Sequence, residues 1–346
     1  MLFNIEFDAG DSIEGYVIPD GFSEQPSILV SDHGGPVARV ACDQLREAVI
    51  GSGRHGSGMV GFRLDATVIP GLAEMETLAI HDAKTGLLIY RRVAIHNRKN
   101  LKIVRLETHM IPSLRLDRYC SEGFQFELFS AERFGHETTL QAFHLQALES
   151  VFISGRLLMK NYEVFLDRGF RAVALLTDPF YEMAGRLFLL KKMSTSPVPF
   201  LGDRDRLILA PAVEHFAEVA LTSTSSLKTA LKKAPTKVRD VLSSPLTRQL
   251  VCTSPEQSTA RADIAAAVDL LSRFTVVGHD NDLAHYQHAL AELFERPVDQ
   301  LPLPPRHMAL QELANKLREL PVAEGLIEHD LILDHYVRQA LRVNTH

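Results

Sequence analysis

Apolar and polar residues alternate along much of the first 95 residues, a pattern typical of half-buried β-strands. Short strands separated by turn residues predict a small antiparallel sandwich or barrel. The turn-forming segment Asp82–Gly86 predicts a hairpin between the last two strands, and a short helix is expected within Cys42–Ile50. The predicted strands are Phe3–Phe7, Ile13–Ile18, Ser27–Val30, Val37–Val40, Met59–Leu64, Thr77–Ile80 and Leu87–Arg91.

From Phe124 onward, the pattern changes to apolar runs followed by amphipathic helices, as in α/β proteins. The predicted strands are Phe124–Phe129, Val151–Ser154, Arg171–Leu176 and Phe274–Val277. The predicted helices are Thr138–Leu148, Glu182–Met193, helices within Leu207–Ala234, Thr259–Ser272, Leu283–Phe294, Met308–Arg318 and Gly325–Leu341.

The stretch between these two regions loses its period and contains Pro112, so we expect it to be a connecting segment. The sequence therefore predicts a β-sandwich-like domain at residues 1–96, a connecting segment at 97–122 and an α/β domain at 123–346.

The amino-acid composition limits the classes of protein to which the chain can belong. The chain is 46% hydrophobic and 23% charged, with a net charge of -6, which is typical of a globular protein and gives no basic excess for nucleic acid. Three well-separated cysteines (Cys42, Cys120 and Cys252) form no CxxC pair, which argues against a zinc knuckle and favours a reducing compartment. Because neither a signal peptide nor a long apolar run is evident, we expect a cytoplasmic protein without a transmembrane segment.

Four colinear segments resemble the carbohydrate sulfotransferases that use 3′-phosphoadenosine-5′-phosphosulfate (PAPS). Phe126–Leu140 is similar to the family's strand, 5′-phosphosulfate loop and helix start. Ile153–Pro179 resembles its Gly-His segment followed by Arg-Asp-Pro, and Ser244–Leu250 its Thr-Arg-x-Leu motif. Ala265–Phe294 resembles a helix, Phe-x-x-Val-Gly and a second helix. In addition to these four segments, Leu331–Ala340 is similar to the closing helix of the family.

The resemblance implies a P-loop-like parallel sheet flanked by helices, with PAPS as cofactor and a glycan or polysaccharide as substrate or ligand. Sulfuryl transfer needs hydrogen-bond donors around the phosphosulfate, a cation at the leaving oxygen and a base for the acceptor hydroxyl. The alignment gives Arg133 and Arg156 as catalytic candidates. The cofactor-binding candidates that it gives are His136, Thr138, Thr139, Asp178, Arg186 and Arg248.

Several of these positions depart from the family's pattern in the phosphosulfate loop. The family's lysine falls on Phe134, beside Arg133, and its two loop glycines become His136 and Glu137. A glutamate there places negative charge against a phosphosulfate. The two threonines that follow could still touch a phosphate, or could serve only as caps of the helix.

The second motif departs as well. The arginine that grips the 3′-phosphate is Thr177 here, and its serine partner is Gly185, next to Arg186. The family's Gly-His is Gly155-Arg156, and an arginine cannot act as a general base at neutral pH. Arg156 could instead bind an anionic group, or could be an ordinary salt-bridged arginine.

Together these substitutions predict a sulfotransferase-like protein that is non-catalytic or altered, acting in surface-polysaccharide or glycan processing. The alternative is an active PAPS-dependent sulfotransferase in which Arg133 and Arg186 fill the lost roles. The sequence leaves open whether the chain is an enzyme.

Two further segments contain residues that often carry chemistry. His279, His285 and His288 resemble a zinc site, but the strand-to-helix context, with Asp280 as the expected helix cap, predicts no metal. The glycine-rich run Gly51–Gly58 precedes a strand and matches no phosphate-binding motif, so a mobile loop is expected.

Overall fold

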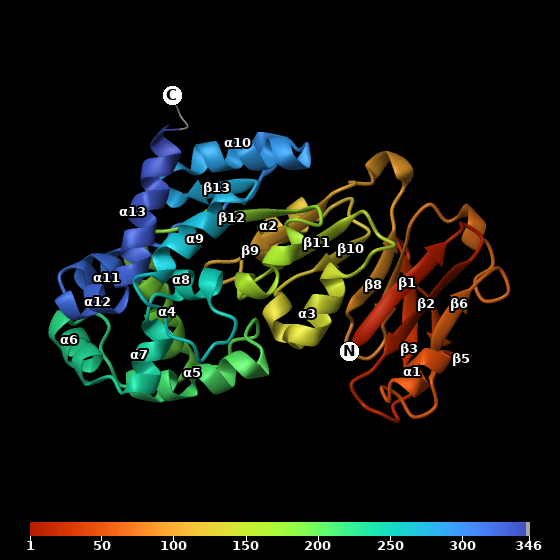
Figure 1. Cartoon of the computed structure of the whole chain (residues 1–346), viewed down its shortest axis with the longest axis horizontal. Coiled ribbons are helices and arrows are strands. Elements are labelled where there is room, and N and C mark those ends of the chain that lie inside the picture. Colours follow the sequence, from red (N-terminus) through yellow and green to blue (C-terminus); the bar gives the residue numbers. More distant parts are fainter. Residues whose placement is uncertain (344–346) are drawn as a thin grey trace. The chain divides into compact units, whose positions relative to one another are not determined.

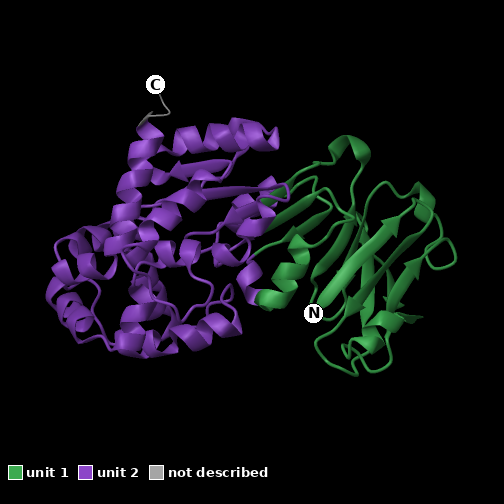
Figure 2. Cartoon of the chain, in the orientation of Figure 1, with its two compact units in different colours: residues 1–103, 121–129, 134–153 green, residues 104–120, 130–133, 154–346 purple. Residues whose placement is uncertain are grey.

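The computed structural model describes residues 1–343, which form two compact units (Figure 2). Unit 1 consists of residues 1–103, 121–129 and 134–153. Unit 2 consists of residues 104–120 and 130–133 and of the described residues from 154 onward. The domain limits predicted from the sequence pattern stay a prediction.

Unit 1 contains two four-stranded antiparallel sheets, with strand orders β1-β2-β6-β5 and β4-β3-β7-β8 (Figure 1). Apolar residues at alternate positions of their strands are buried, which confirms the predicted antiparallel β structure. The strands are β1 (Leu2–Asp8), β2 (Ile13–Ile18), β3 (Ser27–Asp32), β4 (Gly35–Ala41), β5 (Gln44–Leu45), β6 (Met59–Leu64), β7 (Leu78–Asp82) and β8 (Leu88–Arg92).

Local hydrogen bonds fix the turns and edges of this unit. The predicted hairpin between β7 and β8 is confirmed, and the Gly86 N–H donates to the Asp82 carbonyl across it. At the end of β1, the Asp8 carboxylate accepts hydrogen bonds from Tyr90 and Arg92 of β8, which joins the two sheets. The short helix predicted within Cys42–Ile50 is confirmed as α1 (Glu47–Gly51), which follows strand β5 and ends one residue later than predicted.

A five-stranded parallel sheet has the strand order β10-β11-β9-β12-β13. Its strands are β9 (Lys102–Leu106), β10 (Phe126–Leu128), β11 (Val151–Gly155), β12 (Phe170–Leu176) and β13 (Val276–His279). The first strand along the chain therefore lies in the middle of the sheet. The chain returns to one side of it for β10 and β11, and crosses to the other side for β12 and β13.

The expectation that residues 97–122 only connect the two regions is wrong. This segment forms β9, the central strand of the parallel sheet, and α2 (Leu114–Cys120). Arg105 lies in β9 with its side chain almost fully buried and ion-paired. A buried parallel strand normally reads as a continuous apolar run. Arg105 interrupts that run in this short strand, so the sequence pattern does not predict it.

Helices cover the parallel sheet and form a second layer around α4 (Pro179–Met193) (Figure 1). The predicted bounds of α10 (Leu283–Phe294) and α11 (Met308–Arg318) are exact, whereas the predicted closing helix is two helices, α12 (Pro321–Leu326) and α13 (Glu328–Val343). The remaining helices are α3 (Gly135–Phe143), α5 (Asp203–Phe216), α6 (Thr224–Lys233), α7 (Thr236–Leu242), α8 (Pro245–Val251) and α9 (Asp263–Ser272).

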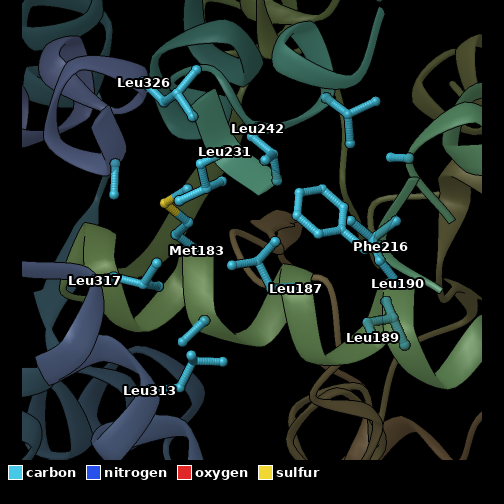
Figure 3. Close-up of a cluster of buried hydrophobic side chains, with 14 of the residues drawn as sticks. Met183, Leu187, Leu189, Leu190, Phe216, Leu231, Leu242, Leu313, Leu317 and Leu326 are labelled. Atoms are coloured by element: carbon cyan, nitrogen blue, oxygen red, sulfur yellow. The ribbon is translucent and has the colours of Figure 1, made fainter. Parts of the chain in front are cut away.

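The helical core of unit 2 is built on α4, whose apolar residues face several other helices (Figure 3). Met183 and Leu187 are fully buried against residues from α5, α6 and α7, and Leu313 and Leu317 of α11 pack on the same cluster. Removing a large side chain from such a core costs about 2–5 kcal/mol. This core fixes α4, which begins shortly after the carboxyl end of β12.

The end of β13 is positioned by close packing of Gly278 against α10. A Cβ atom added to Gly278 would lie 2.2 Å from Cδ2 of Tyr286, which is fully buried. We predict that Gly278→Ala lowers the free energy of unfolding by roughly 2–3 kcal/mol through overpacking. Urea unfolding followed by circular dichroism measures this change.

Gly325→Ala in α12 is the matched control, because nothing lies within 4 Å of its added Cβ. This variant is expected to be unchanged or stabilised by up to about 1 kcal/mol, since alanine favours helix. Equal stability of Gly278→Ala and the wild type would show that β13 does not pack on α10 as described.

Candidate functional site

The residues predicted to bind phosphosulfate in unit 1 are used in local contacts. Helix α3 begins at Gly135, so Thr138 and Thr139 lie inside it and the predicted capping role is wrong. The Thr139 hydroxyl donates to the Gly135 carbonyl (2.9 Å), and the Thr138 hydroxyl donates to the carbonyl of Met1 (3.0 Å). Gly135 has φ +76°, a left-handed conformation that lets the chain enter the helix earlier than the alignment assumes.

The charged residues of the same helix start do not form an anion site either. His136 and Glu137 are both exposed. The Glu137 carboxylate forms an ion pair with Arg54, from the glycine-rich segment of the β structure. A negative side chain at this helix start therefore has its counter-ion within unit 1, as far as the described residues show.

Arg156 is a structural salt-bridge centre in unit 2. Its guanidinium contacts the carboxylates of Glu132 (3.1 Å) and Asp205 (2.6 Å), and its backbone N–H donates to Glu132 (2.9 Å). Burial lowers the pKa of Arg156, but these two carboxylates outweigh that effect and raise it. The geometry favours the salt-bridged interpretation of Arg156, while Arg133 lies exposed in the 3₁₀ turn Ala131–Phe134.

The other three predicted residues lie on α4 and α8. Asp178 caps α4, accepting hydrogen bonds from the N–H groups of Phe180 (2.8 Å) and Tyr181 (3.3 Å). Arg186 is largely buried and forms an ion pair with Glu182 (3.0 Å). Arg248 lies half-buried on α8, with its Nε atom buried and without a hydrogen-bond partner in the described part of the chain.

A crevice of about 450 Å³ opens in unit 2 at the carboxyl ends of β9, β12 and β13. Its walls are formed by the segment after β9, the first turns of α4, the start of α10 and residues 302–307. In open α/β sheets, ligands bind where neighbouring strands lead to opposite sides of the sheet. Strands β9 and β12 have this relation, because their connections lead to β10 and β13 on opposite sides.

Most of the crevice lining is apolar, with a few polar side chains. This combination is typical of small-molecule sites. The polar lining residues include His109, Thr177, Glu182, Asp280 and Arg306.

Three residues at alternate positions, Arg105, Glu107 and His109, form a row of ionic contacts that ends in the crevice. Arg105 contacts Glu107 (2.9 Å) and Asp117 (2.5 Å), and the Glu107 carboxylate lies 3.3 Å from Nδ1 of His109. The carboxylate thus holds Nδ1 of the imidazole. Nε2 remains for a ligand, since the described residues give it no partner.

The same Glu107 carboxylate organises the loop after β9. It accepts hydrogen bonds from the backbone N–H groups of Ser113 (2.7 Å) and His109 (3.2 Å). In a phosphate-binding loop, such N–H groups face the bound anion. Here an internal carboxylate takes that place, so the loop after β9 is not a phosphate cradle.

The pKa values of the titratable groups at and beside the crevice are shifted in different directions. Burial raises the pKa of Glu107, but Arg105 and the hydrogen bonds outweigh it and hold the pKa far below its usual range. Burial lowers the pKa of His109, but Glu107, Glu182 and Asp280 together raise it above its ordinary value. Burial also raises the pKa of Glu182, an effect that Arg186 and His109 only partly offset. Perturbed titratable groups gathered in one cleft are typical of functional sites.

The histidines of the β13–α10 segment do not gather around one point. His279 Nε2 lies 2.7 Å from the Asp334 carboxylate, and His288 Nδ1 lies 2.8 Å from the Ala284 carbonyl. No cluster of three potential metal ligands exists among residues 1–343. The predicted cap is wrong: the side chain that caps α10 is Asp282 (3.1 Å to the N–H of His285), not Asp280.

The sequence pattern does not single out Arg105, Glu107 and His109, because they lie in the segment predicted to be a connection. Arg105, Glu107 and His109 are spaced by two, which places them on one side of an extended chain. That spacing of a cation, an anion and an imidazole was the available signal.

Comparison of the chain with protein-family models, curated proteins and solved structures gives no match. In the part of the chain that the structure describes, every helix falls short of the length or apolar character needed to cross a membrane.

We predict that Glu107→Gln lowers the pKa of His109. Burial disfavours the protonated imidazole, and this variant lacks the Glu107 carboxylate that outweighs the effect of burial. Titration of the His109 imidazole by NMR measures the change, with the exposed His288 as internal control. An unchanged pKa of His109 in this variant would contradict the contact between the Glu107 carboxylate and the imidazole.

The raised pKa of His109 also makes the stability of the fold depend on pH. Since folding raises the pKa of His109, its protonation stabilises the fold below its unfolded pKa of about 6.5 and loses this effect as pH rises through the folded value. The stability difference between wild type and His109→Gln should therefore shrink as pH increases from 5.5 to 8.5, about two units above the unfolded pKa. A difference that grows with pH would reverse the sign assigned here.

Proposed function

We propose that this chain is a sulfotransferase-like α/β protein with an altered site, which binds a small, largely apolar ligand in the crevice beside His109. The observation that supports the proposal most strongly is the position of the crevice at the switch point of the parallel sheet. The sulfotransferase-like identity and the β-sandwich rest on the sequence resemblance and pattern, and a role in glycan processing remains part of this proposal.

Three observations argue against PAPS at the residues that the resemblance indicates. The loop before α3 offers no threonine at the helix start, and Glu137 replaces a glycine there. Arg156 is held by Glu132 and Asp205. The polar groups for which the resemblance gives a role are thus largely engaged within the protein.

The alternative, an active PAPS-dependent sulfotransferase, requires Arg133 and Arg186 to replace the missing cations. Arg186 is largely buried and paired with Glu182, and desolvation together with the charges of Arg156 and Arg248 lowers its pKa. An arginine already paired in the core is a poor replacement for one that must meet a phosphate. The altered, non-catalytic interpretation is therefore the better supported of the two.

We predict that Gly185→Leu blocks the crevice without disturbing the fold. Gly185 lines the crevice, and an added Cβ would meet only Leu310, at 4.0 Å. The neutral fluorescent probe N-phenyl-1-naphthylamine should bind the wild type and bind this variant at least about tenfold more weakly, the loss expected when a side chain fills an apolar pocket. Fluorescence titration gives both dissociation constants.

Gly325→Leu is the matched control, since it adds the same side chain to α12 in open space. Equal probe binding by Gly185→Leu and the wild type would contradict the crevice as the ligand site.

A second expected outcome concerns the cofactor. Adenosine 3′,5′-bisphosphate should leave the melting temperature unchanged, whereas a ligand at 100 times its dissociation constant stabilises a fold by about 2.7 kcal/mol. A specific shift of that size would favour the active alternative.

A further inference from the structure

The polar end of the crevice is organised around the carboxylate of Asp280. Its side chain is 7% exposed, and Oδ2 accepts hydrogen bonds from the Thr177 hydroxyl and the Arg306 guanidinium. Asp280 comes directly after β13, and Thr177 directly after β12. The carboxylate therefore lies where the ends of two neighbouring parallel strands meet, inside the lining of the crevice.

The other oxygen of this carboxylate, Oδ1, is buried and has no hydrogen-bond donor among the described residues. Its neighbour is Nδ1 of His279, at 3.1 Å. That nitrogen accepts a hydrogen bond from the Asn281 N–H (3.1 Å), so it carries no proton, while Nε2 faces the Asp334 carboxylate (2.7 Å). The ring therefore cannot donate to Asp280, and one buried carboxylate oxygen is left unsatisfied. Such a group is costly unless something binds it.

The cation that Asp280 does contact comes from a segment without regular structure. Arg306 belongs to the proline-rich stretch Leu301–His307, which forms one wall of the crevice. Its guanidinium also lies over the ring of Tyr181, 5.4 Å from the centroid, and its side chain is 44% exposed. A carboxylate and an aromatic face together form a typical receptor for a cation. Arg306 occupies this receptor from the solvent side.

The surrounding charges favour a cation as well. Glu107, Glu182 and Asp280 all contribute to raising the pKa of His109, so each of these carboxylates lies near this end of the crevice. Arg105 is balanced by Asp117 and Glu107, and Arg186 by Glu182. If Arg306 leaves, Asp280 loses its positive partner.

We infer that the crevice takes a ligand with an apolar body and a cationic head, an ammonium or guanidinium group, that binds Asp280 and the ring of Tyr181 in place of Arg306. The inference rests on the proposed function, because it concerns the same crevice. Arg306 is then an internal competitor: its side chain holds the head subsite when no ligand is bound, and moves aside with residues 301–307 when one binds. Pairing with Asp280 supplies the preference for a charged head, and the apolar lining supplies affinity for the body.

Three probes with one body and different heads test this inference: 4-phenylbutylamine, 4-phenylbutan-1-ol and 4-phenylbutyrate. Isothermal titration calorimetry should show the amine binding at least about tenfold more tightly than the alcohol, the discrimination expected of one charge-assisted hydrogen bond, and the carboxylate binding most weakly. In Asp280→Asn, the preference for the amine over the alcohol should disappear, while the alcohol still binds.

Arg306→Ala should increase the affinity for the amine several-fold and leave that for the alcohol nearly unchanged, because only the amine competes with the guanidinium. Arg318→Ala is the matched control. Arg318 likewise lies over an aromatic ring, that of Phe180, and pairs with an aspartate, Asp178, but it does not line the crevice. Its removal should leave the ratio of amine to alcohol affinity unchanged.

The outcomes separate the inference from the proposed function. Equal binding of amine and alcohol, tighter binding of the carboxylate, or weaker binding of the amine by Arg306→Ala would overturn the cationic head while the crevice remains a ligand site. An equal gain for amine and alcohol in Arg306→Ala would overturn its role as competitor. Failure of all three probes to bind, or binding that Gly185→Leu leaves intact, would overturn the crevice itself and the inference with it.

Discussion

The buried carboxylate of Glu107 is the contact on which the rest of the site depends. The N–H of Glu107 donates to the Gly155 carbonyl in the next strand, and the Glu107 carbonyl accepts a hydrogen bond from the Gln249 side chain of α8. The Glu107 carboxylate contacts Arg105, His109 and the N–H of Ser113. A buried ion is tolerated only when its charge and hydrogen bonds are satisfied together. One side chain thus closes the loop after β9, orients the imidazole and shapes one wall of the crevice.

The order of the parallel strands explains why the crevice lies there and not beside α3. The segment that resembles a phosphosulfate loop follows β10, at the edge of the sheet, whereas the topological switch lies between β9 and β12. Thr177 and Asp280 reach the crevice because β12 and β13 are neighbours that end together. The segment that resembles the phosphosulfate loop and the crevice therefore follow different strands of the same sheet.

Much of the fold could be predicted from pattern, because most strands and helices bury regular apolar faces; the bounds of β2, β6, α10 and α11 agree exactly. The central strand could not, because burial of Arg105 depends on partners from other segments, Asp117 among them. The site predicted from the sequence also depends on contacts with other segments, which the sequence alone does not show. The sequence singled out Asp178 and Arg186 on α4, but it could not show that neighbouring Glu182 and Gly185 line the crevice while Arg186 turns into an ion pair.

Photo-affinity labelling with an aryl diazirine that carries an alkylammonium group tests the central claim most directly, because mass spectrometry of the labelled peptides reports where a ligand lies. The account predicts labels in residues 109–116, 175–185 and 302–310, which surround the crevice, and their loss when the amine probe is present in excess. Competed labelling confined to residues 130–140, the segment that resembles the phosphosulfate loop, would contradict the account.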